Sequence, residues 1–381
     1  MDFDFSEEQR MLADSLGKLI TDRYGFENRK TYAKQPEGWS REIWAAYAEM
    51  GILGLPFAEE DVGFGGGAVE TMIVAEALGG ALGLEPWFAT VVLGGGFLRH
   101  GADSAMRQAL VPLVAEGSLL LAFAHTEPNA RFDLHHVETT ATKDGEGWVL
   151  SGRKGVVLHG DVAGKIFVTA RTAGGPRNEA GIGVFLVDAG ASGLTRRGYA
   201  TSDGLRAAEI TLDGVRAEAV LGDAAGGLPL VRRVVDDAIA ALASEAVGAM
   251  DASLKLTLEY MRTRKQFGRA IGAFQSLQHR AADMMVALEQ ARSMAMYAAM
   301  MTDEPDAAER ARAMHAVKLQ MGRFSKFVGQ QAIQLHGGIG MTMEYAVGHY
   351  FKRLTTIDTQ FGDAEHHLAA LSEAGGLFEA A

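Results

Sequence analysis

The sequence predicts an α+β protein in which a β domain stands between two helical domains. Three observations predict this order. Apolar residues recur at helical spacing over residues 1–118, short apolar or alternating runs occupy residues 119–226, and long helical patterns return over residues 227–381. A chain of 381 residues also exceeds the ~250–300 residues that one hydrophobic core usually supports. Because strands and helices are segregated rather than alternating, a Rossmann-type dinucleotide fold is disfavoured.

The first segment, residues 1–118, is predicted to form a helical domain. Ser6 can cap a helix while Gln9, three residues later, returns the hydrogen bond. An apolar stripe at helical spacing follows, at Met11, Leu12, Leu16, Leu19 and Ile20. Similar patterns predict further helices around Trp44 to Met50, ended by Gly51, and over residues 69–78 and 105–114.

The second segment, residues 119–226, is predicted to form an antiparallel β-sheet or a small β-barrel. Turn sequences such as Lys143-Asp144-Gly145 and Leu212-Asp213-Gly214 separate its short runs. The predicted strands cover residues 119–126, 137–142, 148–151, 166–170, 183–187 and 209–212.

The third segment, residues 227–381, is predicted to form a four-helix bundle. One helix is expected from Ala307 to Leu335, because apolar residues step by three and four along it. At ~1.5 Å per residue this helix would be ~40 Å long. An apolar seam of that length favours a bundle, including one that is shared between subunits.

Composition excludes several classes of function. The net charge is −12, so no basic face is expected for a nucleic acid or an anionic membrane. There are no cysteines, which excludes disulfides, thiolate nucleophiles and cysteine-type zinc sites. No apolar run reaches the ~18 residues of a membrane span, and the N-terminus lacks an apolar signal region. We therefore expect a cytoplasmic protein with no nucleic-acid partner and no membrane span.

Histidines offer no metal site by their spacing. His135-His136 and His366-His367 are adjacent pairs, whose side chains point apart on a helix or strand. Metal sites on helices use histidines four residues apart, so no metal is predicted.

Two stretches of the last segment carry candidate binding chemistry. The first runs from Tyr260 to Gly268, as YMRTRKQFG, and the second from Gln334 to Gly340, as QLHGGIG. Each can be an ordinary helix end, since glycine favours C-caps and basic residues compensate the helix dipole. Alternatively, glycines let a backbone approach a flat or charged ligand, and Arg264 offers a fork of donors for phosphate.

Taken together and in this order, these stretches resemble the acyl-CoA dehydrogenase family. The β segment also contains Thr126-Glu127-Pro128, which is similar to the flavin loop of that family. The resemblance runs nearly end to end and implies FAD as cofactor, an acyl-CoA substrate and α,β-desaturation of the thioester in fatty acid or dicarboxylic acid metabolism. It also implies a carboxylate base that removes the α-proton, usually a desolvated Glu with a raised pKa.

The resemblance assigns FAD contacts to two groups of residues. The pyrophosphate and adenine end would be held by Arg264, Gln266, Phe267, Gln334, Gly337 and Gly338. The flavin ring would lie near Phe123, His125 and Thr126.

At the base position this chain departs from the family. Where relatives have Glu-Gly-Thr, it has Phe361-Gly362-Asp363, and Phe cannot accept a proton. Some relatives place the base on the first long helix of the last domain, where this chain has Ala238 followed by Ile239 in place of an Arg. Leu158 also stands where relatives have a Thr that bonds the flavin ring. The weak candidates for a relocated base are Asp363 and Asp237; these two, Asp236 and Glu245 are more typical of solvated or capping charges.

These departures predict a half-site subunit that supplies the ADP end of an FAD site. A larger homologous partner would supply the base and ring pocket, in an α2β2 tetramer. More narrowly, the chain resembles the small subunit of pimeloyl-CoA dehydrogenase. One alternative is a self-sufficient homotetramer with a relocated carboxylate base, and another is a non-catalytic assembly or binding protein that retains the fold.

Overall fold

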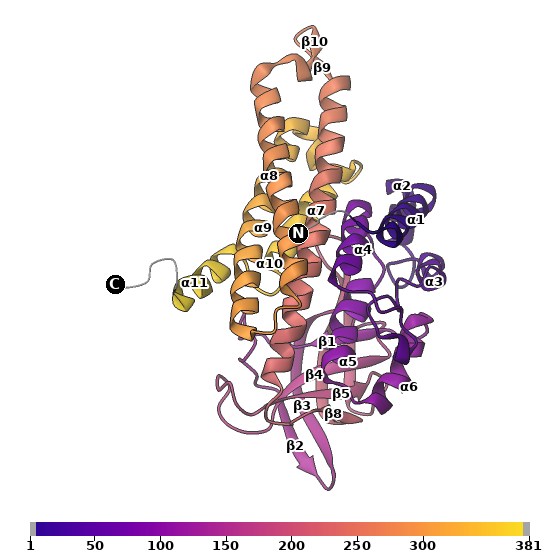
Figure 1. Cartoon of the computed structure of the whole chain (residues 1–381), viewed down its shortest axis with the longest axis vertical. Coiled ribbons are helices and arrows are strands. Elements are labelled where there is room, and N and C mark those ends of the chain that lie inside the picture. The colour runs from indigo at the N-terminus through magenta and orange to yellow at the C-terminus, as the bar shows by residue number, and fades with distance from the viewer. Residues whose placement is uncertain (1–4, 376–381) are drawn as a thin grey trace. The chain divides into compact units, whose positions relative to one another are not determined.

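The computed structural model describes residues 5–375, which form two compact units (Figure 1). Of the described residues, the first unit comprises residues 5–31, 68–83 and 239–375, and the second comprises Tyr32–Gly67 and Leu84–Ala238. Both units are therefore assembled from segments that are distant in sequence.

The helices and strands follow the predicted helical, β, helical order. Along the chain they are α1 (Glu7–Arg23), α2 (Phe26–Tyr32), α3 (Arg41–Glu49), η1 (Glu59–Asp61), α4 (Ala68–Ala81), η2 (Phe88–Gly94), α5 (Gly95–Gly101), α6 (Ser104–Ala115), β1 (Leu121–Ala124), β2 (Thr140–Asp144), β3 (Gly147–Leu158), β4 (Lys165–Arg171), β5 (Ile182–Asp188), β6 (Leu194–Ala200), β7 (Arg206–Arg216), β8 (Ala219–Leu221), α7 (Leu228–Thr263), β9 (Lys265–Gln266), β10 (Arg269–Ala270), η3 (Ile271–Ala273), α8 (Gln275–Met301), α9 (Ala307–His336), η4 (Gly337–Met341), α10 (Ala346–Thr359) and α11 (Ala364–Ala374).

In the first unit, helices pack around α9. This helix contacts α8, α10 and α11, while α4 contacts both α1 and α8. The predicted N-terminal start is confirmed, because Ser6 and Gln9 form a reciprocal capping box at the start of α1. The predicted helix over residues 307–335 is α9, and its inward face is buried at Met314, Val317, Met321, Val328 and Leu335.

In the second unit, one sheet carries the core. Its strand order is β6-β7-β3-β2-β4-β5-β8, with β1 added against β4, so the sheet is open rather than closed into a barrel. Most neighbours are antiparallel as predicted, but β1 and β2 each pair in parallel with β4. Parallel pairing needs a long connection between strands, which local turn signals do not reveal.

Several elements were not anticipated from periodicity. The exposed strand β6 lacks apolar alternation, and the π-helical turn η2 lies wholly inside the apolar stretch that precedes α5. β3 is longer than expected because it continues past a β-bulge between Lys154 and Val157. Across the part of the chain that the structure describes, no helix is both long and apolar enough to cross a membrane.

Candidate functional site

The first candidate stretch forms a tight β-hairpin rather than a helix C-cap. α7 ends at Thr263, and β9 and β10 then pair Gln266 with Arg269. The two residues of the turn, Phe267 and Gly268, both have positive φ, at 55° and 79°. Such turns suit the right-handed twist of a hairpin, but they favour Asn-Gly and not a bulky aromatic residue at the first position. Phe267 is 90% exposed, so the hairpin presents an aromatic ring to solvent from a backbone position with an unfavourable φ.

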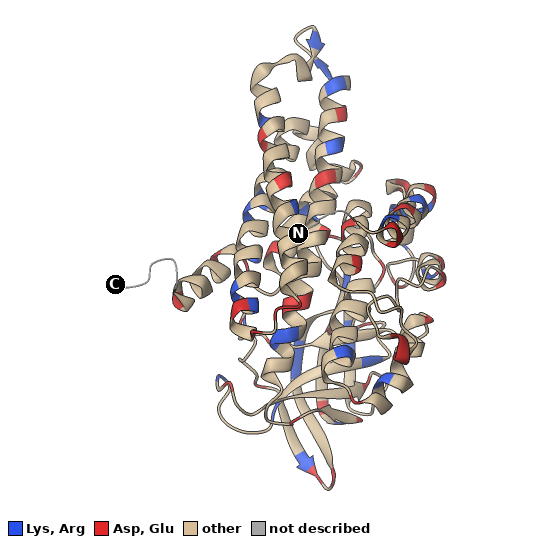
Figure 2. Ribbon diagram, viewed as in Figure 1, with Lys and Arg blue, Asp and Glu red and all other residues tan. Residues whose placement is uncertain are grey.

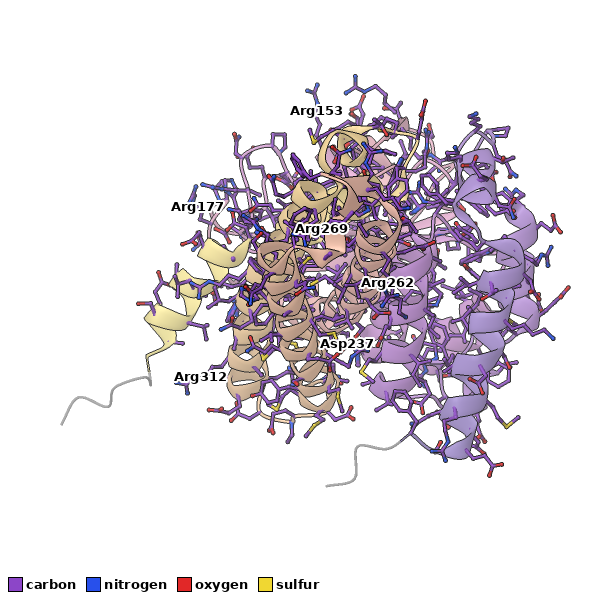
Figure 3. All side chains as sticks on the ribbon, turned by 90° about the horizontal axis from the view of Figure 1, so that it is seen from above. Arg153, Arg177, Asp237, Arg262, Arg269 and Arg312 are labelled. Atoms are coloured by element: carbon purple, nitrogen blue, oxygen red, sulfur yellow. The ribbon has the colours of Figure 1, made fainter. Side chains whose placement is uncertain are left out.

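Basic residues surround this hairpin without acidic partners. Arg262, Arg264, Lys265 and Arg269 are all exposed, and the sequence has no acidic residue between Glu259 and Asp283. Figure 2 shows the blue of Lys and Arg on β9, β10 and the adjoining end of α7. Figure 3 looks onto this end and labels two of the cations, Arg262 and Arg269. Arg269 lies 4.2 Å above the ring of Phe274, and within residues 5–375 none of the four cations makes a salt bridge.

The second stretch forms the glycine turn that ends α9. Gly337 caps the helix with φ 63° and ψ −140°, a conformation that favours glycine. Gly338 has no positive φ, and a Cβ atom built there would meet nothing within 4 Å. Packing within the described chain therefore does not require glycine at Gly338. A glycine there leaves its backbone open to close approach by another molecule.

An aromatic stack that sequence reasoning missed joins the two stretches. The ring of Tyr260, one turn before Arg264, stacks on His336 with centroids 4.6 Å apart and an interplanar angle of 27°. Tyr345 also packs against His336, with ring centroids 5.1 Å apart. A signal existed, because Tyr260 and His336 each lie within a candidate stretch, but only the tertiary fold brings the two stretches to the same end of the unit.

The residues predicted to hold the ADP end of FAD thus share one exposed end of the first unit. Arg264, Gln266, Phe267, Gln334, Gly337 and Gly338 are all exposed. Unpaired cations suit a pyrophosphate, an uncovered aromatic ring suits an adenine or ribose face, and Gly338 leaves space for close approach. This end fits the anionic half of FAD on chemical grounds that are independent of the resemblance.

The residues predicted near the flavin ring lie in the second unit and are engaged in its core. Phe123 is 3% exposed and packs between Phe97 and His125, with centroid distances of 4.6 and 4.8 Å. Burial, with the Lys154 charge adding to it, lowers the pKa of His125 to about 3, so this imidazole is neutral. Leu158 ends β3 and offers no donor. His125 and Thr126 are half-buried, and Thr126 Oγ1 lies 3.4 Å from His125 Nδ1 and 3.3 Å from its Nε2.

A buried ion pair, missed by sequence analysis, supports the loop around Thr126. Lys154 Nζ lies 2.7 Å from Glu127 Oε1, and the two side chains are 0% and 2% exposed. Glu127 also accepts from the backbone N–H groups of Glu138 and Thr139. Burial lowers the pKa of Lys154 to about 8, although the Glu127 carboxylate opposes that shift. The pair anchors the loop to β3 and β2.

The segment where the resemblance places the base is a well-anchored turn. Phe361 is half-buried and has φ 57°, an uncommon conformation for a bulky side chain. The Lys318 ammonium, which is 1% exposed, donates to the carbonyl oxygens of Ile357, Asp358 and Gly362 at 2.8, 2.7 and 2.8 Å. Lys318 therefore caps the C-terminal end of α10 and holds the turn in place.

Two histidines complete this anchor. His367 Nε2 lies 3.1 Å from the Phe361 carbonyl oxygen, to which it donates, and its Nδ1 lies 2.8 Å from His315 Nδ1. With His367 neutral, its Nδ1 accepts a hydrogen bond from the Nδ1–H of His315. Burial, together with the charge of Lys318, lowers the pKa of His367 to about 2.

The carboxylates considered as relocated bases already have structural partners. Asp237 Oδ2 lies 3.1 Å from Arg99 and 2.8 Å from His100. Burial raises the pKa of Asp237, but these contacts outweigh burial, so the pKa is lowered overall. Glu245 forms a bidentate pair with Arg353 at 2.6 and 2.8 Å. Asp363 is the N-cap of α11 and accepts from the His366 N–H. Each of these carboxylates already accepts hydrogen bonds within the chain.

Comparisons with known proteins agree with this architecture. The chain matches the acyl-CoA dehydrogenase N-terminal domain over residues 6–118, the middle domain over residues 122–215 and the C-terminal domain over residues 225–375. It is 30% identical over 375 residues to a probable acyl-CoA dehydrogenase, YngJ, of Bacillus subtilis, covering 96% of this chain and 97% of the relative.

Solved structures give the same result. The Tcur3481-Tcur3483 steroid ACAD variant has a TM-score of 0.88 and 28% identity, covering 97% of each chain. The FAD complex of PigA has a TM-score of 0.88 and 25% identity, covering 98% of each chain. The ChsE4-ChsE5 complex from Mycobacterium tuberculosis has a TM-score of 0.87, covering 100% of each chain, and at 24% identity it shows the fold alone.

Proposed function

The chain belongs to the acyl-CoA dehydrogenase family, whose members oxidise acyl-CoA with FAD, and we propose that it acts as the half-site subunit of a heteromer. In this proposal the exposed end of the first unit binds the pyrophosphate and adenine part of FAD. A larger homologous partner holds the flavin ring and the base. FAD would accept the hydride from the substrate β-carbon, and the partner's carboxylate would take the α-proton.

One contrast within the chain carries the proposal. Among the described residues, the four exposed cations have no acidic partner, Phe267 is 90% exposed although it meets Phe274 edge-on, and a Cβ at Gly338 would meet nothing within 4 Å. The carboxylates that could replace the missing base are, in contrast, already committed to Arg99, Arg353 or a helix N-terminus. A half-site subunit requires an end that can bind an anion, and it does not require a base of its own.

The partner proposal extends the resemblance to two-subunit dehydrogenases, of which pimeloyl-CoA dehydrogenase is the model we favour. Relatives such as the Tcur3481-Tcur3483 steroid ACAD and the ChsE4-ChsE5 complex carry the names of two components. We propose an α2β2 assembly in the cytoplasm, with an acyl-CoA substrate whose chain-length preference is set by the partner.

Purification tests the assembly directly. The chain produced alone is expected to be colourless and inactive, whereas recovery from its native cell should bring along a larger homologue and bound FAD. A yellow preparation of the single chain that reduces its own flavin on addition of an acyl-CoA would contradict the half-site and favour the self-sufficient homotetramer.

Substitution of Arg264 tests the binding edge within the complex. A bidentate contact to phosphate contributes two charge-assisted hydrogen bonds, so Arg264→Ala should weaken FAD binding by ~3 kcal/mol, or ~100-fold. Arg323→Ala is the matched control, because Arg323 is also an exposed arginine of the first unit but lies on α9, outside both candidate stretches. Equal FAD content in both variants and the parent would favour the non-catalytic assembly role.

Gly338 provides a second test with a different readout. Gly338→Ala should leave the free energy of unfolding within ~0.5 kcal/mol of the parent, since its Cβ meets nothing within 4 Å. Bound FAD per complex should nevertheless fall, because the methyl group occupies the space of the approaching ligand. Unchanged FAD content would show that nothing approaches this backbone.

A further inference from the structure

The imidazole of His336 connects the two halves of the end that is proposed to bind the ADP part of FAD. His336 is only 3% exposed, although Gly337 and Gly338, which follow it, are exposed. It is the last residue of α9, so its backbone leads directly into the glycine turn. Tyr260, whose ring stacks on it, lies four residues before Arg264. One ring is therefore covalently joined to one half and packed against the other.

A hydrogen bond fixes the orientation of this ring. His336 Nδ1 lies 2.8 Å from the carbonyl oxygen of Ala332, one turn earlier on α9, so Nδ1 carries the proton and donates it to that oxygen. Nε2 is then an acceptor, and it is buried without a hydrogen-bond partner among the described residues. Burial lowers the pKa of His336, and the bond to Ala332 opposes this shift without reversing it. The ring is therefore neutral and contributes mainly by packing.

Tyr345 completes a cluster of three rings around His336. Its ring centroid lies 5.1 Å from that of His336 and 6.4 Å from that of Tyr260. Tyr345 is the N-cap residue of α10, so the end of α7, the end of α9 and the start of α10 meet at this cluster. Tilted and offset aromatic pairs at such distances are stabilising beyond the area that they bury.

Tyr260 transmits its position to the hairpin. The N–H of Arg264 donates to the Tyr260 carbonyl oxygen at 2.8 Å, and the N–H of Ile271 donates to the Arg264 carbonyl oxygen at 2.9 Å. The hairpin is thus closed at Arg264, directly above the stacked ring. Its strands β9 and β10 have two residues each, and so small a hairpin does not hold its own place in water. The stack at its base supplies a fixed support.

We propose that His336 is a positioning residue for FAD binding, whose ring sets the separation between Arg264 and the Gly338 backbone so that both reach one pyrophosphate. This inference rests on the proposed function, because it assumes that the pyrophosphate binds at this end. Groups that bind one ligand together must be held to within ~0.5 Å by side chains that are themselves locked. A support that orders these groups before FAD arrives reduces the free energy that binding must spend on ordering them.

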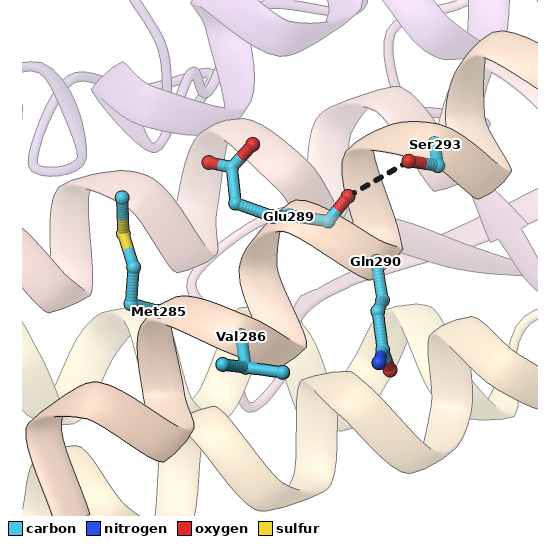
Figure 4. A pocket seen from close by; sticks show the side chains of 5 residues that line it. All are labelled: Met285, Val286, Glu289, Gln290 and Ser293. Carbon is cyan, nitrogen blue, oxygen red and sulfur yellow. Dashed lines mark hydrogen bonds between the residues drawn. The ribbon is translucent and has the colours of Figure 1, made fainter.

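The surface depression on α8, in the same unit, does not offer a competing site for the pyrophosphate. Figure 4 shows the residues that line it, which are Met285, Val286, Glu289, Gln290 and Ser293. Glu289 is the one charged residue among them, and its carboxylate repels a phosphate. Changes in FAD affinity of the variants below can therefore be assigned to the hairpin and the glycine turn.

The test is the dissociation constant for FAD of the complex reconstituted with the larger partner, measured by equilibrium dialysis beside urea unfolding. His336→Ala should raise this constant ~10-fold, the factor that corresponds to the loss of the aromatic contacts. His336→Phe keeps a ring and loses only the bond to Ala332, so it should restore the constant to within ~2-fold of the parent. If affinity follows the imidazole nitrogens rather than the ring, so that His336→Phe folds but binds as weakly as His336→Ala, the proposal is overturned.

Leu288→Ala is the control for a general loss of stability. Leu288 is 1% exposed on α8, outside both candidate stretches, and its truncation leaves a cavity in the same unit. Leu288→Ala should therefore destabilise the chain to urea but leave the dissociation constant for FAD within ~2-fold of the parent. Hydrogen exchange of a peptide covering residues 264–271 should accelerate in His336→Ala and not in Leu288→Ala. Equal FAD affinities in the two variants would overturn the proposal.

A double-mutant cycle assigns the effect to the contact between the two rings. Tyr260→Ala combined with His336→Ala should bind FAD about as weakly as the weaker single variant, because both changes remove the same contact. Fully additive effects would show that the two rings act independently and would overturn the proposal. Arg264→Ala separates the two levels of inference. If it weakens FAD binding and His336→Ala does not, only the positioning role fails, and if neither does, the proposed function fails as well.

Discussion

Lys318 provides a quantitative test of how the turn at the usual base position is held. We consider Lys318→Met, which keeps the length of the side chain and removes its three donors. Three hydrogen bonds from a charged group contribute ~5–9 kcal/mol in total. Burial lowers the pKa of Lys318 from 10.5 to about 8, which corresponds to ~3 kcal/mol spent on keeping the ammonium charged. The net loss of stability expected from the substitution is therefore ~2–6 kcal/mol.

The assay is equilibrium unfolding in urea at pH 7, combined with hydrogen exchange of a peptide covering residues 356–367. Lys318→Met should lower the free energy of unfolding by the stated amount and speed exchange in that peptide. Lys326→Met is the control, because Lys326 lies on the same helix α9 but is exposed. A loss below ~1 kcal/mol, or one equal to the control, would refute the conclusion that Lys318 secures this turn.

Three further predictions concern charge and backbone. His125 and His367 stay neutral in the folded chain, with pKa values of about 3 and about 2, whereas unfolded histidine has a pKa near ~6.5. As the pH falls, only the unfolded state takes up these protons. Each histidine should therefore lower the free energy of unfolding by up to ~1.4 kcal/mol for each unit by which the pH falls between ~6.5 and ~5. His367→Asn should reduce this pH dependence in urea titrations, and an unchanged dependence would contradict a neutral His367. Glu127→Gln leaves the Lys154 charge buried without its carboxylate and should cost ~3–5 kcal/mol; a loss within ~1 kcal/mol, measured in urea, would argue against a charged Lys154. Gly337→Ala should cost ~1–2 kcal/mol because of its positive φ alone, and a neutral result would show that the turn relaxes.

Local sequence determined the elements that depend on neighbours along the chain. The capping box of α1 and the seam of α9 follow from residues within a few positions of one another, and both formed as predicted. Local sequence also determined those chemical properties that depend on residue identity alone. Phe361 cannot accept a proton, and the stretch between Glu259 and Asp283 is basic whatever its conformation.

Tertiary structure decided what long-range partners control. From sequence the stretch around Phe267 could be a helix end or a ligand-binding turn. It forms a hairpin because β9 and β10 pair, and this pairing makes Phe267 an exposed tip. Tyr260 meets His336, and Lys318 meets the turn at Gly362, across separations at which periodicity carries no information. Parallel pairing of β1 with β4 was missed for the same reason, since hydrogen bonds between distant strands leave no local signature. Residue types therefore indicated which chemistry the side chains of this chain can and cannot perform. Packing determined which charged side chains remain exposed to another molecule.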